Sequence, residues 1–96
     1  MNTSVLHKRP IRSPEVWVRQ TRGENAIYDP TTGSVHILNE TAQAIWDLCD
    51  GDTTVAEMVD AICTLTAMHR DIVVEDVDRI LTEFGSAGLL TWRVPE

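Results

Sequence analysis

The sequence has no membrane-length apolar run and no secretory signal, so two classes of protein are excluded at once. Its longest stretch without Asp, Glu, Lys or Arg is the ten residues Pro30 to Asn39, whereas a transmembrane helix needs about 20 apolar residues. No apolar segment follows the basic pair Lys8 and Arg9, as a signal peptide would require. We therefore predict a cytosolic protein without a membrane partner.

Signatures of catalysis and of metal binding are also missing. The three histidines are far apart in the sequence, at residues 7, 36 and 69, and no HExxH spacing occurs. No serine stands in a nucleophile elbow, and there is no glycine-rich phosphate loop or dinucleotide fingerprint. We expect no enzymatic activity, no metal and no cofactor. Cys49 and Cys63 fall on apolar stripes of predicted helices, which favours buried thiols over a disulfide or a reactive thiol.

Basic residues are scarce outside the N-terminal part of the chain. The formal net charge is −7, but residues 1–22 hold five basic residues against one acidic residue, and residues 23–96 hold three basic against fourteen acidic. An acidic body repels phosphate backbones. A nucleic-acid partner is therefore not expected, and a basic peptide or a basic patch on another protein is favoured instead.

The 96 residues, 43% of them hydrophobic, suffice for one domain with its own core. We predict a flexible basic arm at residues 1–14, a folded domain at residues 15–90 and a C-terminal tail at residues 91–96. The alternation of Leu90, Trp92 and Val94 leaves two interpretations open for the end of the chain, a further strand or a packed apolar tail.

Three short strands are predicted first, at residues 16–20, 25–28 and 34–38. The connections between them are short, which favours a three-stranded antiparallel meander whose third strand is an edge. Between Ser34 and Leu38 there is no charge and no proline, although soluble proteins usually protect an edge with such residues. Either the N-terminal arm or the C-terminal segment covers this edge, or it is open to a strand from a partner.

Three helices are predicted to follow. The first has Asn39 as its N-cap and Gly51 as its C′ residue. The second opens with Thr54 and Glu57 spaced as a capping box, and should end near residues 69–70.

The third helix is predicted to begin near residues 73–74 and to stop at Gly88. Its acidic residues are Glu75, Asp76, Asp78 and Glu83. Composition alone explains them as a solvated face, and those near the N-terminus also suit the helix dipole.

The segments YDPTTG, SVHILNETAQAIWDLCDG and TTVAEMV, followed by DV…IL…F…AGLL, together resemble the PqqD family, also described as RiPP recognition elements. The resemblance extends from about Arg9 to Leu90. Its most specific part is the LN…A..IW.L.DG pattern, which is formed by Leu38, Asn39, Ala42, Ile45, Trp46, Leu48, Asp50 and Gly51.

The resemblance implies an α+β, winged-helix-like domain without catalytic activity, in which a three-stranded antiparallel sheet is followed by three α-helices. It implies that the chain binds the leader of a ribosomally synthesised precursor peptide and presents it to a separate tailoring enzyme, radical S-adenosylmethionine enzymes being one such class. The leader would add as a strand along the third strand and lie against the third helix. The peptide-binding residues would then be Ser34, Val35, His36, Ile37 and Leu38 on the strand, and Asp76, Arg79, Ile80, Glu83 and Phe84 on the helix.

Two other hypotheses stay open. A sheet with three helices could be a winged-helix DNA-binding protein, but the third helix would then be expected to be basic, and it is acidic. The chain could also be a structural subunit of a modifying-enzyme complex that binds no leader. Salt-dependent retention on DNA would favour the first, and co-purification with an enzyme whose affinity ignores the precursor would favour the second.

Overall fold

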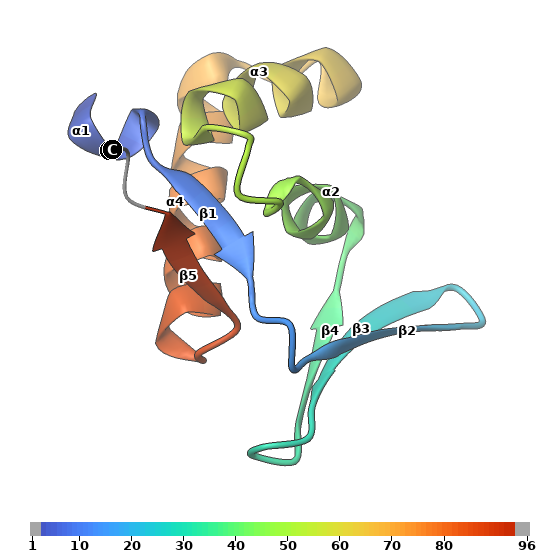
Figure 1. Cartoon of the computed structure of the whole chain (residues 1–96). Helices are drawn as coiled ribbons and strands as arrows, with labels where there is room; N and C mark the ends of the chain where they lie inside the picture. Colours follow the sequence, from blue (N-terminus) through green and yellow to red (C-terminus); the bar gives the residue numbers. More distant parts are fainter. Residues whose placement is uncertain (1–2, 94–96) are drawn as a thin grey trace.

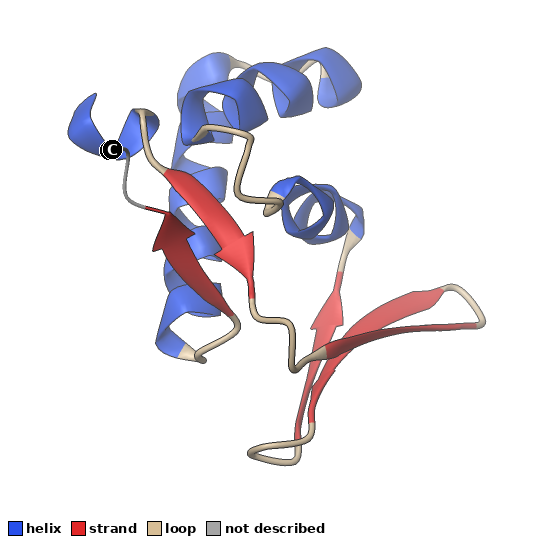
Figure 2. Ribbon diagram, in the orientation of Figure 1, coloured by secondary structure: helices blue, strands red, loops and turns tan. Residues whose placement is uncertain are grey.

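Two small antiparallel sheets and three main helices make up the structure, a computed structural model that describes residues 3–93 (Figures 1 and 2). In chain order the elements are α1 Thr3–Leu6, β1 Arg9–Arg12, β2 Trp17–Thr21, β3 Glu24–Asp29, β4 Ser34–Leu38, α2 Glu40–Leu48, α3 Val55–Thr66, α4 Arg70–Ser86 and β5 Leu90–Arg93. No helix in this part of the chain is both long and apolar enough to cross a membrane.

The predicted fold class is confirmed. Strands β2, β3 and β4 form an antiparallel sheet in that order, and α2, α3 and α4 follow it. The observed bounds of β4 are those predicted, and the bounds of β2 and β3 differ by one residue at each end.

A buried aspartate fixes the turn that leads into β4. Asp29 is 6% exposed, its Oδ1 accepts the N–H of Thr31 at 2.9 Å, and its carbonyl oxygen accepts the N–H of Gly33 at 2.8 Å. Asp and Asn favour such turns because their side chains can bond backbone groups two residues ahead. The turn therefore sets the register in which β4 returns along β3.

The predicted helix starts are confirmed for α2 and α3. Asn39 caps α2 by accepting the N–H of Ala42 at 2.8 Å. At the start of α3 the Thr54 hydroxyl accepts the N–H of Glu57, while the Glu57 carboxylate accepts the N–H of Thr54. Both bonds of a capping box are present, so this helix start is defined locally.

The predicted end of the first helix is wrong. Helix α2 ends at Leu48 with Cys49 as its cap, so Gly51 is not its C′ residue. Gly51 instead lies in the turn towards α3 with φ 81°, and a Cβ there would lie 3.1 Å from Cδ1 of Ile11. The glycine is needed for a left-handed conformation and for the close approach of β1.

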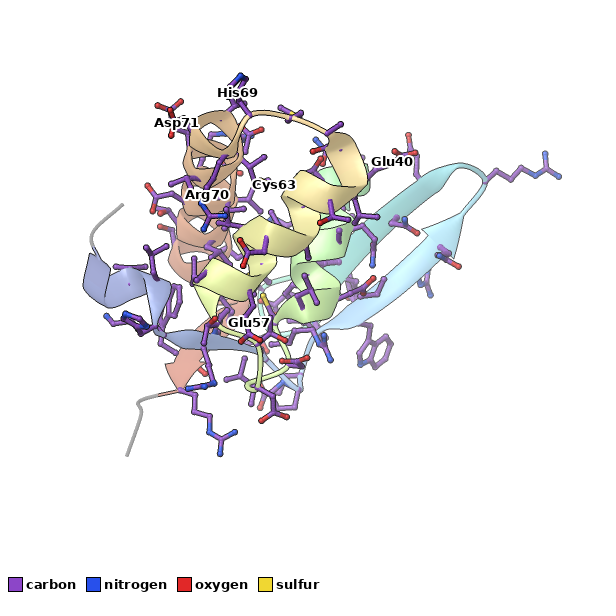
Figure 3. The ribbon with its side chains drawn as sticks, turned by 90° about the horizontal axis from the view of Figure 1, so that it is seen from above. Glu40, Glu57, Cys63, His69, Arg70 and Asp71 are labelled. Carbon is purple, nitrogen blue, oxygen red and sulfur yellow. The ribbon has the colours of Figure 1, made fainter. Side chains whose placement is uncertain are left out.

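The boundary between the second and third helices is also corrected. Helix α3 ends at Thr66 because Ala67 adopts a left-handed conformation with φ 56°, and α4 begins at Arg70, three residues before the predicted start. Figure 3 shows His69, Arg70 and Asp71 at this junction. The predicted stop at Gly88 is confirmed, since α4 ends at Ser86 and Gly88 has φ 74°.

The N-terminal segment is not the loosely held arm that was predicted. Strand β1 pairs antiparallel with β5, from Arg9 opposite Arg93 to Arg12 opposite Leu90. This pairing also resolves the two interpretations of the chain end in favour of a strand. Residues 1–2 of the predicted arm and residues 94–96 of the predicted tail lie outside the described residues.

The core lies where the helices meet the inner face of the larger sheet and the chain around β5. It is formed by Ile27, Leu38, Ala42, Ile45, Trp46, Cys49, Val55, Met58, Val59, Ile62, Val73, Val77, Ile80, Leu81, Phe84, Leu89 and Leu90. Because Leu38 and Ile27 belong to β4 and β3, the sheet is anchored to the helices by one face only.

Candidate functional site

Strand β4 is an edge of its sheet, as predicted. It pairs with β3 on one side, and within residues 3–93 no strand pairs with its other side. The β1–β5 pair forms a separate sheet. An unpaired edge exposes a row of backbone donors and acceptors that another chain can use.

The turn between β2 and β3 shows which backbone groups of β3 point towards β2 and which point towards β4. Thr21 and Glu24 flank a two-residue turn at residues 22–23 and are register partners. Residues that close such a turn form a hydrogen-bonded pair. Bonded and non-bonded pairs alternate along an antiparallel ladder, so Ala26 and Tyr28 also direct their backbone groups towards β2.

The intervening residues of β3 must therefore face β4. Their register partners on β4 are Ser34, His36 and Leu38. Backbone groups alternate in direction along a strand. The N–H and C=O groups of Val35 and Ile37 therefore point away from β3, towards the open side of β4. The open edge thus offers two donors and two acceptors.

The side chains of β4 divide in the same way between two faces. Leu38 is 6% exposed and belongs to the core, whereas Val35 and Ile37 are 62% and 68% exposed. One face of β4 therefore meets the helices, and the opposite face is open and apolar.

A groove of about 350 Å³ lies between the end of β4 and α4. It is lined by His36, Ile37, Leu38, Asn39, Ala42, Arg79, Ile80, Glu83, Phe84 and Leu89. Leu38, Ile80, Phe84 and Leu89 are all buried, so the floor is apolar, and the polar residues are exposed or half-buried around it. Concave apolar sites with a few polar groups are typical of ligand binding.

The floor is held in place from below. The rings of Phe84 and Trp46 pack edge to face, with centroids 5.4 Å apart, and Trp46 is 2% exposed. Such aromatic pairs add to the stability gained from burial alone. The position of Phe84 in the groove is therefore fixed by the packing of α2 against α4.

The charged rim of the groove is held only weakly. Arg79 lies 3.6 Å from Asp76 and 3.6 Å from Glu83 on the same helix, and all three side chains are at least 37% exposed. Exposed ion pairs of this kind contribute little to stability. Their charges can therefore exchange partners when a charged ligand approaches.

Of the ten predicted binding residues, seven line the groove. They are His36, Ile37, Leu38, Arg79, Ile80, Glu83 and Phe84. The other three lie beside it: Ser34 starts β4 at the turn, Val35 is on the exposed face, and Asp76 lies one turn earlier on α4. The role of all ten residues in peptide binding stays a prediction.

Three groove residues were not predicted. Asn39 and Ala42 belong to the first turn of α2, and Leu89 follows the stop at Gly88. The signal for the first two was the direct passage from strand to helix at Asn39, which places this helix turn at the end of the edge. Leu89 could not be found from helical periodicity because it lies beyond α4.

The cysteines are thiols in the structure. Both are free; Cys49 is buried and Cys63 half-buried. Burial raises the pKa of the Cys49 thiol to about 12 against an opposing effect of Arg12, and its Sγ donates to the carbonyl oxygen of Ile45 at 3.2 Å. Cys49 therefore behaves as a small core residue. Among the described residues, no three His, Cys, Asp or Glu side chains gather where they could hold a metal ion.

No curated protein matches the chain. The solved structure of TbiB1 in complex with the TbiA(beta) leader peptide is similar, with a TM-score of 0.76 and 25% sequence identity over 88% of this chain and 99% of that chain. Residues 24–90 match the family described as Coenzyme PQQ synthesis protein D (PqqD). This match covers more than half of the chain, and the chain therefore belongs to the PqqD family.

Proposed function

We propose that this protein binds the leader of a ribosomally synthesised precursor peptide by strand addition to β4, and presents it to a separate tailoring enzyme. The chain itself performs no chemistry on the peptide. The leader forms a fourth strand beside β4 and directs alternate side chains into the groove against α4. Strand addition of this kind gains affinity from main-chain bonds and specificity from adjoining pockets.

The observation that carries the proposal is the open, uncharged edge directly beside an apolar groove. Ile37 belongs to both features, because its backbone groups point outward and the residue also lines the groove. A peptide bound there makes backbone bonds and apolar contacts together. The similarity to TbiB1, whose structure contains a leader peptide, supports the same occupant.

The other edge of the sheet is a poor alternative. Strand β2 carries Arg19, and both Trp17 and Val18 are exposed, at 57% and 43%, although they lie on opposite faces of the strand. Since β2 is exposed on both faces, a peptide at that edge would gain backbone bonds but would have no buried apolar floor beside it.

The charge of α4 does not favour DNA binding, although a winged-helix protein would place this helix in the major groove of the DNA. Helix α4 includes Arg70 and Arg79, but it also carries five acidic residues: Asp71, Glu75, Asp76, Asp78 and Glu83. Arg70 is bonded to Asp60 of α3, and Arg79 is flanked by two carboxylates. A phosphate backbone would meet net negative charge along this surface.

The direct test is calorimetric titration of a synthetic leader peptide, taken from the precursor encoded beside the gene of this protein. The test variant is Ile37→Pro, which removes an outward N–H without removing a bond to β3, because proline has no donor. We expect its affinity to fall at least about tenfold, the effect of losing roughly 1.4 kcal/mol. Circular dichroism and urea unfolding should show that the variant remains folded.

The matched control is Gln20→Pro. Like residue 37, residue 20 lies on an edge strand and has an outward N–H, since its register partner Asn25 faces β4 instead. The control should bind the leader with wild-type affinity. Equal affinity in the wild-type and Ile37→Pro proteins would rule out strand addition at β4.

A further inference from the structure

The face of the sheet opposite the groove has a direct geometric link to the open edge. Val35 and Ile37 present their backbone groups outward, and they also hold their side chains on this face, 62% and 68% exposed. Any strand that bonds to them must place alternate side chains next to theirs, whichever direction it runs, because side chains of adjacent strands align. A peptide at the edge therefore has a second contact surface besides the groove.

Two cross-strand rows already run over this outer face. The register aligns Trp17, Tyr28 and Val35 in one row, and Arg19, Ala26 and Ile37 in the next. The rings of Trp17 and Tyr28 have centroids 6.1 Å apart at 57°. Each row ends at β4 with an exposed β-branched side chain. A strand added beside β4 would place one further side chain in each row.

An open hollow of about 520 Å³ lies at Ala26, in the second row. Its walls are Arg19, Glu24, Tyr28, Val35 and Ile37. Arg19 and Glu24 have opposite charges and lie on the side away from the edge, whereas the side next to the edge is apolar. The part of the face that a docked strand reaches first is therefore suited to apolar side chains.

We infer that the peptide bound at β4 is recognised on both faces of the sheet. Its alternate side chains that lie opposite Val35 and Ile37 are aromatic or β-branched and extend the two rows, while the intervening side chains enter the groove. This inference rests on the proposed function and specifies the peptide: over the docked segment it is apolar at successive positions, not only at every second one. Cross-strand pairs of this type each stabilise a sheet measurably.

The docked peptide is favoured as the occupant because it is continuous with the edge. A strand held by the backbone groups of Val35 and Ile37 covers their side chains without any additional contact. A separate protein or a second copy of this chain would need a larger complementary area to bind here stably.

The test uses a library of random peptides displayed on phage and selected on the wild-type protein. The selected peptides are then synthesised, scanned with alanine, and titrated against wild type, Ile37→Pro and Val35→Thr. Val35→Thr keeps the shape, the β-branching and the backbone, and changes only the polarity of a side chain outside the groove. The matched control is Val18→Thr, the same change at an exposed valine on β2.

We expect alanine sensitivity at successive peptide positions and a loss of affinity of about threefold or more in Val35→Thr, which corresponds to the upper part of the range for one cross-strand pair. Val18→Thr should bind within twofold of wild type. Substituting threonine for the peptide residue opposite position 35 should remove most of the difference between Val35→Thr and wild type, because the two residues form one pair.

The outcomes separate this inference from the proposed function. If Ile37→Pro abolishes binding, but sensitivity occurs only at alternate positions and Val35→Thr binds normally, recognition on the outer face is overturned and strand addition stands. If the selected peptides ignore Ile37→Pro, the proposed function itself fails. If analytical ultracentrifugation of the peptide-free protein shows a dimer that Val35→Thr dissociates, a second copy covers this face and the inference is overturned.

Discussion

In the described part of the chain, the outer sides of β1 and β4 differ: that of β1 is hydrogen-bonded to another part of the chain, and that of β4 is open. Strand β1 pairs with β5 on one side, and its segment is bonded on the other side to the chain between α2 and α3. The bonds run from Arg12 N–H to the Cys49 carbonyl, from Gly51 N–H to the Pro10 carbonyl and from Val55 N–H to the Lys8 carbonyl, at 2.9, 2.9 and 3.1 Å. Strand β4, by contrast, has an open side within residues 3–93.

The difference shows where the ends of the chain are used. One interpretation of the sequence was that the N-terminal arm or the C-terminal segment covers the β4 edge, and for the described residues this is wrong. These segments pair with each other instead and bind the turn between α2 and α3 (Figure 1). Within residues 3–93, neither segment pairs with β4.

The largest expected effect tests whether the floor of the groove is also part of the core. Phe84→Ala should destabilise the protein by about 3–5 kcal/mol, because it leaves a cavity beneath the groove and removes the contact with Trp46. Urea unfolding measures this change. Glu83→Ala, which alters the exposed rim one residue away, should change stability by about 0.5 kcal/mol or less. A similar small effect for Phe84→Ala would show that the groove is not built on the core.

The next prediction tests the closed side. One nitrogen of Arg12 donates to the carbonyl oxygens of Trp46 and Asp47, at 3.0 and 2.9 Å, where α2 ends. Arg12→Ala should lower the free energy of unfolding by about 2 kcal/mol, because charged bonds to the negative end of the helix dipole are lost. Arg19→Ala, on exposed β2, should have little effect. Equal effects in the two variants would mean that the β1–β5 pair does not hold α2.

Sequence reasoning found the open side of the molecule and missed the closed side, for a physical reason. Strand β4, its turn and the cap at Asn39 are set by neighbouring residues, so alternation and capping rules predict them. The pairing of Arg9 with Arg93 joins the two ends of the chain, and the RPIR segment is too short and too polar to show a strand period. Local patterns cannot reveal such long-range pairs.

The candidate site divides in a similar way. The β4 residues follow from the alternation of a strand, and Ile80 and Phe84 follow from the spacing of a helix. The family resemblance supplied the prediction that this strand and this helix lie side by side. Asn39 and Leu89 lie between secondary-structure elements, so neither the strand alternation nor the helical spacing includes them. The early end of α3 at Thr66 was missed because Ala67, a strong helix former, takes a left-handed conformation that its residue type does not favour.

A smaller, pH-dependent effect on stability is expected at Asp50, in the turn between α2 and α3. Asp50 Oδ1 accepts the N–H groups of Asp52 and Thr53, both at 2.9 Å, and the bond from Asp52 contributes most to lowering its pKa. A lowered pKa stabilises the fold above the unfolded value of about 3.9, and this contribution is lost as the pH falls through the folded value. Asp50→Asn should therefore cost about 1 kcal/mol or less at pH 7, since the group is exposed to solvent.

The pH dependence is the decisive part of that experiment. Urea unfolding of wild type and Asp50→Asn at pH 7 and at pH 3 should show a difference at pH 7 that shrinks at pH 3. A difference that is independent of pH would assign the loss to the shape of the amide and not to the carboxylate charge.

The smallest expected effect is on the open edge itself. Ile37→Thr should change the free energy of unfolding by about 0.5 kcal/mol or less, because the side chain is 68% exposed and threonine keeps its β-branching. The neighbouring substitution Leu38→Thr should cost several times more, because that side chain is 6% exposed in the core. Urea unfolding of both variants compares the two faces of one strand. If Ile37→Thr proved as costly as Leu38→Thr, some part of the folded protein would already contact Ile37, and the edge would not be open to a partner.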